Sequence, residues 1–98
     1  MHVEIRSHHA RLPRAHALGL AERIRGLFSR LAHHIVRIVV RVDDATGPGL
    51  AARECTVEVH HPNGQVTIVR ERQRRLGALL HRATERAWRA TALAAGRT

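Results

Sequence analysis

Arginine is the residue type in this sequence whose number and spacing could do chemistry. All 17 basic residues are arginine, only 8 residues are acidic, and the formal net charge is +9 at pH 7. The planar guanidinium group can hold two phosphate oxygens at once and can stack on a nucleobase. Codon usage in a GC-rich genome would explain why arginine replaces lysine, but it would not explain the excess of positive charge. The composition therefore predicts a polyanionic partner, with nucleic acid favoured over an anionic membrane.

The arginines recur at helical spacing in two segments. Near the end of the chain they are separated by seven, four and three residues, which places them on one helical stripe beside an apolar stripe. An earlier segment carries two arginines seven residues apart, and Glu22 and Glu85 are the few acids that could balance these rows. Solvated faces of amphipathic helices look similar but usually contain more acids. We predict that the rows border one basic groove and that these residues bind RNA phosphates: Arg23, Arg30, Arg75, Arg82, Arg86 and Arg89.

Histidine and cysteine offer a second kind of chemistry, metal binding. Six of the nine histidines form adjacent pairs, but neighbours in a strand point to opposite faces, so such pairs seldom chelate one ion. The sequence has no CxxC or HExxH motif, and its one cysteine, Cys55, alternates with valines. We predict no metal, no other cofactor, no internal disulfide, and a core position for Cys55. Some loop histidines would add hydrogen bonds near phosphate.

Residues for catalysis form no recognisable arrangement. There is no Ser-His-Asp order, no Gly-rich phosphate loop, and no carboxylate pair except Asp43-Asp44, which is placed to begin a turn. We therefore predict neither an enzyme nor a small-molecule substrate. The chain has no apolar run long enough to span a bilayer, and its first residues lack the apolar section of a signal peptide. These features predict a soluble, cytoplasmic protein without a membrane partner.

The periodicity of apolar residues predicts the elements that position the arginines. Period-two alternation indicates strands, with Val36, Ile38, Val40 and Val42 on one face of the second. Spacings of three and four indicate two helices. Asn63-Gly64 is typical of a tight hairpin turn, and 43–52 reads as a loop containing Gly47, Pro48 and Gly49. The predicted strands are 2–6, 35–44, 54–59 and 65–70, and the predicted helices are 13–33 and 74–93.

The order of elements predicts an α+β fold with the sequence β-α-β-β-β-α. Two helices should pack on one face of a four-stranded sheet, and residues 1–98 should form a single domain. The buried stripe of the first helix would be Ala17, Leu20, Ala21, Ile24, Leu27, Phe28 and Leu31, and that of the last Leu76, Leu80, Ala83, Ala87 and Ala90. The opposite face of the sheet would present Glu4, Arg37, Arg41, Thr56 and Glu58 to solvent.

Several segments, taken together, resemble a known family. They are HVEIRS, FSRLAHHIVRI, RVDDATGPG, ECTVEVHHPNG and the helix that follows RRLGALL. The chain resembles the short form of the ribosome hibernation-promoting factor and ribosome-associated inhibitor family. Two departures are visible: the last helix lacks the family's aromatic residue and two acids near its start, and Pro13-Arg14 replaces the Thr-Glu that often opens the first helix.

The resemblance implies a fold similar to a double-stranded-RNA-binding domain and a role without catalysis. The protein would bind small-subunit rRNA in the decoding channel, where messenger and transfer RNA lie, and would silence translation on idle ribosomes under stress. The family's basic helix faces match Arg23, Arg30, Arg82, Arg86 and Arg89 approximately. Long members continue into a second, dimerising domain, which we do not expect here, so ribosome pairing would need a separate partner.

Two other functions fit parts of the sequence. A general module for structured RNA, without a ribosomal role, would share the fold and the charge, and the departures in the last helix favour it. A structural protein that dimerises through an edge strand would use its charge for solubility alone. DNA binding is a further alternative, although no helix-turn-helix spacing is present to support it.

Overall fold

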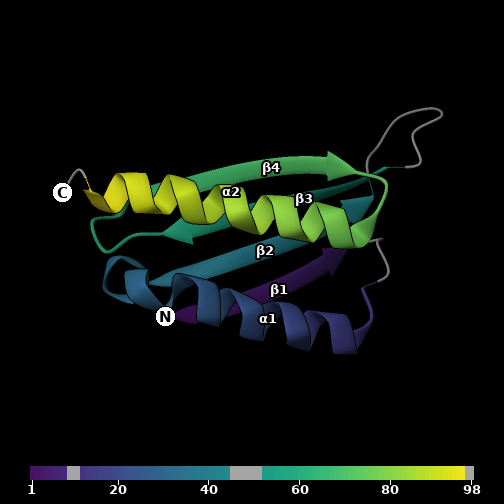
Figure 1. Cartoon of the computed structure of the whole chain (residues 1–98), viewed down its shortest axis with the longest axis horizontal. Helices are drawn as coiled ribbons and strands as arrows, with labels where there is room; N and C mark the ends of the chain where they lie inside the picture. The colour runs from purple at the N-terminus through teal and green to yellow at the C-terminus, as the bar shows by residue number, and fades with distance from the viewer. Residues whose placement is uncertain (9–11, 45–51, 97–98) are drawn as a thin grey trace.

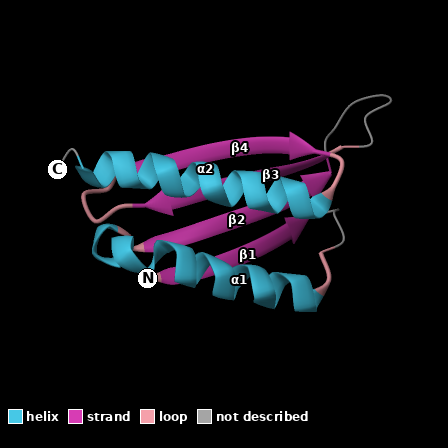
Figure 2. Cartoon of the chain, viewed as in Figure 1, coloured by secondary structure: helices cyan, strands magenta, loops and turns pink. Residues whose placement is uncertain are grey.

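The computed structural model describes residues 1–8, 12–44 and 52–96, with His8 described for its backbone alone. The order of elements is β-α-β-β-β-α, which confirms the prediction (Figure 2). The helix of the first crossover ends in a short 3-10 helix, η1. The elements are β1 (His2–His8), α1 (Arg14–Phe28), η1 (Ser29–His34), β2 (Arg37–Asp44), β3 (Arg53–His60), β4 (Val66–Gln73) and α2 (Leu76–Gly96).

The four strands form one mixed sheet in the order β1-β2-β3-β4. β1 and β2 are parallel, because the α1 crossover returns the chain to the end of the sheet where it started. β2, β3 and β4 are successive antiparallel neighbours. The turn between β3 and β4 forms at the predicted Asn63-Gly64 pair, where Gly64 has a φ of 89° and the Asn63 side chain accepts a hydrogen bond from the Gln65 amide.

Both helices cover the same face of the sheet, as predicted (Figure 1). α2 packs on β3 and β4, and α1 packs on β1, so the two helices lie over different strands. Ile24, Phe28 and Leu79 are fully buried in the layer between helices and sheet. Burying each of these large side chains contributes roughly 1.5–3 kcal/mol, which makes the core the main source of stability. The sheet contributes Ile38, Val40, Val42, Cys55, Val57 and Val59 to it.

The structure differs from the predictions at two apolar positions. Leu27 and Val36 were placed inward but are 40% and 53% exposed, because Leu27 lies at the side of α1 and Val36 precedes the start of β2. Val39 lies on the solvent face yet is only 1% exposed, since long side chains surround it on all sides. Ile68, also on that face, is 59% exposed because β4 is an edge strand with a neighbour on one side.

Local chemistry explains where α1 begins and ends. α1 follows Pro13, whose fixed φ suits a helix start. The helix predicted to reach residue 33 ends at Phe28, where the Ser29 hydroxyl donates back to the Gly26 carbonyl.

None of the helices in the described residues is long and apolar enough to cross a membrane. Most of the loop predicted over 43–52, with Gly47, Pro48 and Gly49, lies outside the described residues.

Candidate nucleic-acid interface

Net positive charge is concentrated on the side of the sheet that carries the helices. We define the helix layer as α1, η1, α2 and the connecting residues 74–75. Among the residues of the helix layer, nine arginines face two glutamates, Glu22 and Glu85. Most of these arginines are exposed, because the helices turn only their apolar stripes toward the sheet. The arginines are Arg14, Arg23, Arg25, Arg30, Arg74, Arg75, Arg82, Arg86 and Arg89.

The outer side of α2 gathers three of the predicted RNA-binding residues. Arg82, Arg86 and Arg89 line one shallow hollow of about 230 Å³ together with Glu71 and Glu85. Arg86 donates to Glu71 at 2.7 Å and to the Arg70 carbonyl at 3.0 Å, so its guanidinium ties α2 to β4. Arg89 donates to Glu85 at 2.7 Å, whereas Arg82 has no carboxylate partner among the described residues.

Each paired arginine keeps hydrogen-bond donors for a further acceptor. A guanidinium carries five N–H groups, and these ion pairs use one or two of them. Since three arginines share two carboxylates, the hollow remains positive overall. The arrangement can therefore hold phosphate oxygens in addition to its internal partners.

A second feature, the interhelical groove, runs between α1 and α2. One part is a hollow of about 360 Å³ near the start of α2, and the other is a hollow of about 550 Å³ beside Trp88. Arg23 of α1 lines both parts, and its Nη2 lies 2.5 Å from Nδ1 of His81 on α2. The groove has leucine walls and a polar rim. Its residues are Ala15, His16, Gly19, Leu20, Arg23, Leu76, Gly77 and Leu80 in the first part, and Arg23, Leu27, His81, Thr84, Glu85, Trp88 and Arg89 in the second.

The polar rim forms a chain of contacts across the groove. An arginine can only donate, so Nδ1 of His81 must be the acceptor of the Arg23 bond. The ring proton then lies on Nε2, which faces Glu85 at 3.3 Å. Glu85 in turn receives Arg89 on its other oxygen. The guanidinium of Arg23 therefore meets a neutral ring nitrogen, and it has no carboxylate partner among the described residues.

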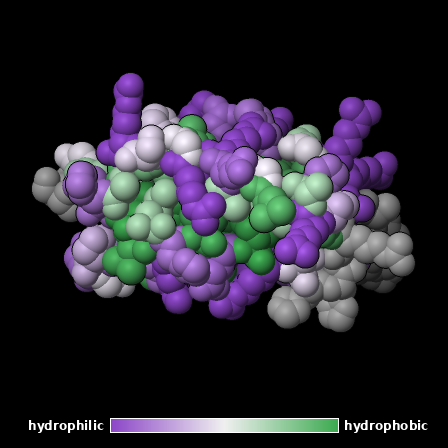
Figure 3. Space-filling view, turned by 90° about the horizontal axis from the view of Figure 1, so that it is seen from below, coloured by the Kyte–Doolittle hydropathy of each residue, from purple (hydrophilic) through white to green (hydrophobic). Residues whose placement is uncertain are grey.

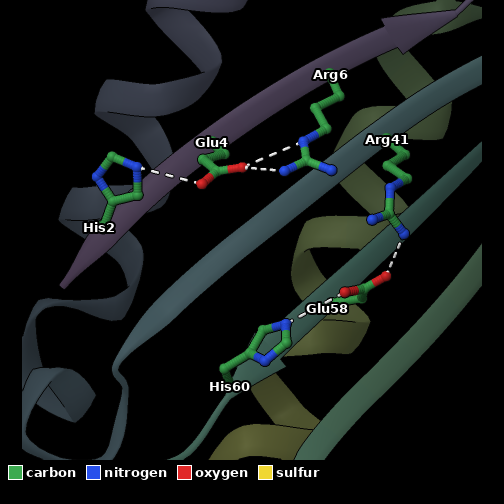
Figure 4. Close-up of polar contacts among 6 residues, drawn as sticks. All are labelled: His2, Glu4, Arg6, Arg41, Glu58 and His60. Carbon is green, nitrogen blue, oxygen red and sulfur yellow. Dashed lines mark hydrogen bonds and ion pairs between the residues drawn. The ribbon is translucent and has the colours of Figure 1, made fainter.

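The open face of the sheet, which the helices do not cover, balances its own charge. Two parallel sets of side chains each place a glutamate between a histidine and an arginine (Figure 4). In the first, Glu4 lies 2.8 Å from Arg6 and 3.5 Å from His2. In the second, Glu58 contacts Arg41 and lies 3.2 Å from His60. The hydrogen bond from Arg6 lowers the pKa of Glu4, so that carboxylate stays charged to lower pH.

The whole open face follows the same pattern. Its described residues include five arginines and four carboxylates, and Arg72 pairs with Glu54 at 3.0 Å. Little charge is left over for a polyanion. The arginines are Arg6, Arg37, Arg41, Arg70 and Arg72, and the carboxylates are Glu4, Asp43, Glu54 and Glu58.

Cys55 and the histidines form no chemical centre among the described residues. Cys55 is buried in the core, as predicted, and burial raises the pKa of its thiol to about 12. No group of three or more histidine, cysteine or acidic side chains in the described ranges is placed to hold a metal ion. His61 has a structural role instead, since it contacts the His34 carbonyl and the Thr67 hydroxyl and so joins η1 to β4.

Comparison with solved structures finds the same fold in proteins of distant sequence. The N-terminal domain of Protein Y from Thermus thermophilus superposes with a TM-score of 0.72 over 93% of this chain and 96% of its own, at 17% identity. A ribosomal subunit interface protein from Coxiella burnetii superposes with a TM-score of 0.74 over 98% of this chain and 99% of its own, at 10% identity. This chain shares their fold. Both belong to the ribosome hibernation-promoting factor family, so the resemblance seen in the sequence is confirmed for the fold.

Matches to family models and to curated proteins do not add to this result. No protein-family model matches the chain, and no curated protein sequence matches it. At identities of 10–17%, most side chains differ while the backbone path is kept. The likeness therefore concerns the fold alone, and the surface must be assessed from this chain's own residues.

The structure divides the predicted RNA-binding residues into separate groups. Arg82, Arg86 and Arg89 come together on the outer side of α2, and Arg23 and Arg89 meet at the interhelical groove. Arg30 on η1 and Arg75 before α2 are exposed but line neither feature. The two arginine rows thus lie on one side of the sheet without bordering a single groove, because α2 stands between Arg82 and the groove.

Three residues of this surface were not predicted from the sequence: His81, Trp88 and Glu71. The spacing of His81 and Glu85, four residues apart on a helix, was a signal for their contact. Trp88 is the one tryptophan of the chain and sits beside Arg89, which could have marked it as part of a binding surface. The pairing of Glu71 with Arg86 had no signal in the sequence, since it depends on where α2 crosses β4.

Proposed function

We propose that this chain is a ribosome hibernation factor that binds small-subunit rRNA through its helix layer. The observation that carries the proposal is a fold shared along nearly the whole chain with a protein described as a ribosomal subunit interface protein. The charge distribution supports it independently, because positive charge is concentrated on the helix layer and nearly cancelled on the open face. The proposed contacts are made by Arg23, Arg30, Arg75, Arg82, Arg86 and Arg89.

The proposed site is the decoding channel, where messenger and transfer RNA would otherwise lie. The arginine guanidinium groups of the helix layer would hold rRNA phosphates. The bound protein would block translation by occupying the channel. This mechanism needs no catalysis, no cofactor and no small-molecule substrate, and it would operate in the cytoplasm. Phosphate contacts release counterions, so each contact would steepen the dependence of log affinity on log salt by roughly 0.7–0.9.

The test is pelleting of the purified protein with small ribosomal subunits across a salt series, with transfer RNA as the competitor. We expect saturable binding that falls steeply with salt and is displaced by transfer RNA. Binding that transfer RNA leaves unchanged, or that naked duplex RNA matches in affinity, would contradict the proposed site. It would favour a general module for structured RNA, which has the same fold and the same charged surface.

A control variant separates specific contacts from bulk charge. Leu18→Glu adds one negative charge to an exposed position of α1 that lines neither the groove nor the α2 hollow. Seen from the side of α1 and β1, the surface shows apolar patches between hydrophilic side chains (Figure 3). We expect Leu18→Glu to change affinity by no more than about twofold.

A further inference from the structure

We propose that the Trp88 end of the interhelical groove binds one unpaired nucleotide of the bound RNA. The base would stack on Trp88, and the phosphate would be held by Arg23 and Arg89. This inference rests on the proposed function and adds a ligand class to it, an unstacked nucleotide in place of duplex backbone alone.

The shape of the groove suits a flat ring with a charged group at one side. The hollow beside Trp88 has a volume of about 550 Å³, within the range of roughly 300–1,000 Å³ found for small-molecule sites. Leu27, Thr84 and Trp88 line it, and Trp88 is partly buried against the core, so its ring is held in place. Aromatic side chains of this kind stack on bases of any sequence.

The charge at the rim selects an anion. Arg23 and Arg89 come from the two helices and face one carboxylate, Glu85. Both oxygens of Glu85 already have partners, Arg89 on one and His81 on the other. Arg23 donates to a neutral histidine nitrogen, so a phosphate oxygen would be a stronger acceptor than its present partner. The rim is therefore positive overall, and it favours a phosphate over an acidic side chain that would need to enter an apolar groove.

The position of the groove explains why the nucleotide must be unpaired. The groove lies between two helices that pack on different strands, and Trp88 lies within it. A base inside a duplex is stacked on both sides and cannot offer a face to Trp88, whereas bases of loops and bulges can. Duplex RNA would contact the exposed arginines of α2 without entering the groove.

Intrinsic fluorescence gives a direct test, because the chain has one tryptophan and no tyrosine. The protein is titrated with a short single-stranded RNA of mixed sequence, and then with the same strand annealed to its complement. We expect the single strand to quench the emission of Trp88, and the duplex to bind with little change in emission. Binding of the single strand without a change in emission would overturn the inference, and so would equal quenching by the duplex.

Variants test the same site through affinity, measured by anisotropy of labelled RNA. Trp88→Leu should weaken binding of the single strand about tenfold and change duplex binding by no more than about twofold. Leu27→Glu, at an exposed position of the groove wall, should weaken single-strand binding by a similar factor without touching the core. Its matched control is Leu18→Glu on the same helix, and equal effects of the two would overturn the inference.

The inference and the proposed function fail in different ways. One outcome is that small subunits bind, but RNA leaves the emission of Trp88 unchanged and Leu27→Glu leaves the affinity unchanged. In that case the groove is not a nucleotide site and the proposed function stands. If neither the RNA strands nor the small subunits bind, the proposed function fails and the inference fails with it. Quenching by free single strands without any binding to small subunits would support the groove and contradict the ribosomal role.

Discussion

Arginines and carboxylates lie on both sides of the sheet, but the open face pairs a larger share of its arginines with carboxylates. On the helix layer, nine described arginines face two glutamates, and Arg23 and Arg82 have no carboxylate partner among the described residues. On the open face, five arginines alternate with four carboxylates, and Arg6, Arg41 and Arg72 each pair with a glutamate. The placement of the acids, more than the number of arginines, decides which side attracts a polyanion.

Strand and helix geometry explain the contrast. Residues two apart on a strand share a face, so His2, Glu4 and Arg6 meet in a line, and cross-strand neighbours add further pairs such as Arg41 with Glu58. On a helix the neighbours are three or four residues apart, and α2 offers one acid, Glu85, for its whole length. Exposed pairs contribute only about 0–1 kcal/mol each, so the open-face network shapes the charge pattern more than the stability.

The largest expected effect is the loss of stability caused by a charge placed between α1 and the sheet. Ile24 is fully buried beneath α1, so Ile24→Asp should cost on the order of 4 kcal/mol or more and abolish cooperative folding. The matched change Ile68→Asp, on the open face at 59% exposure, should leave the fold intact. Circular dichroism during urea unfolding measures both. A cooperative transition retained by Ile24→Asp would show that α1 is not part of the core.

The next effect tests which side binds RNA. Changing Arg82, Arg86 and Arg89 together to Ala should weaken small-subunit binding at least about tenfold and reduce the salt slope by up to about three. Changing Arg6, Arg41 and Arg72 to Ala removes the same charge from the open face and should weaken binding only about twofold. Equal losses in the two triple variants would show that total charge matters and that its location does not.

A third prediction concerns Cys55, which is buried in the core between the helices and the sheet. Burial raises the pKa of Cys55 to about 12, above the ordinary thiol value of about 8.5, so the folded state favours the protonated thiol. Its contribution to stability is complete below that ordinary value and is lost as the pH rises toward 12. At neutral pH, a thiol-specific disulfide reagent should label Cys55 only as fast as the protein unfolds. Rapid labelling of the native protein would mean that the helix layer does not cover β3.

The smallest expected effect is a change in the pKa of one carboxyl group on the open face. The pKa of Glu4 is lowered by its hydrogen bond with Arg6, so Arg6→Ala should raise it toward the ordinary glutamate value. A lowered pKa stabilises the folded state above the ordinary value, and this contribution is lost as the pH falls through the lowered value. An NMR titration of the Glu4 carboxyl group in the two proteins measures the change. An unchanged midpoint would show that the pair seen in the structure does not hold in solution.

Much of the fold could be predicted from the sequence, because the core repeats a simple period. The alternation of β2 and the spacing of Leu20, Ile24 and Phe28 report directly which face is buried. Val39 and Ile68 escaped that rule, since their exposure depends on whether strands with long side chains flank them on both sides. The hydrophobic pattern of a strand shows which of its faces is apolar. The exposure of a side chain also depends on whether its strand lies at the centre or at the edge of the sheet.

The candidate site could be predicted only in part. The basic stripe of α2 follows from spacing along one helix, and Arg82, Arg86 and Arg89 do lie together. The contact of Arg23 with His81 requires the two helices to be placed side by side, and that of Arg86 with Glu71 requires the crossing of α2 over β4. Neither placement is encoded in a local pattern, because each depends on packing between segments far apart in the chain.

Chemical modification of the arginines can show whether the helix layer is the side that binds RNA. The wild-type protein, free and bound to small ribosomal subunits, is treated with an arginine-specific dicarbonyl reagent, and modification is read peptide by peptide by mass spectrometry. We expect binding to protect Arg23, Arg82 and Arg89, while Arg6 and Arg37 on the open face react as before. Protection of Arg6 and Arg37 with unchanged reactivity on α1 and α2 would contradict it.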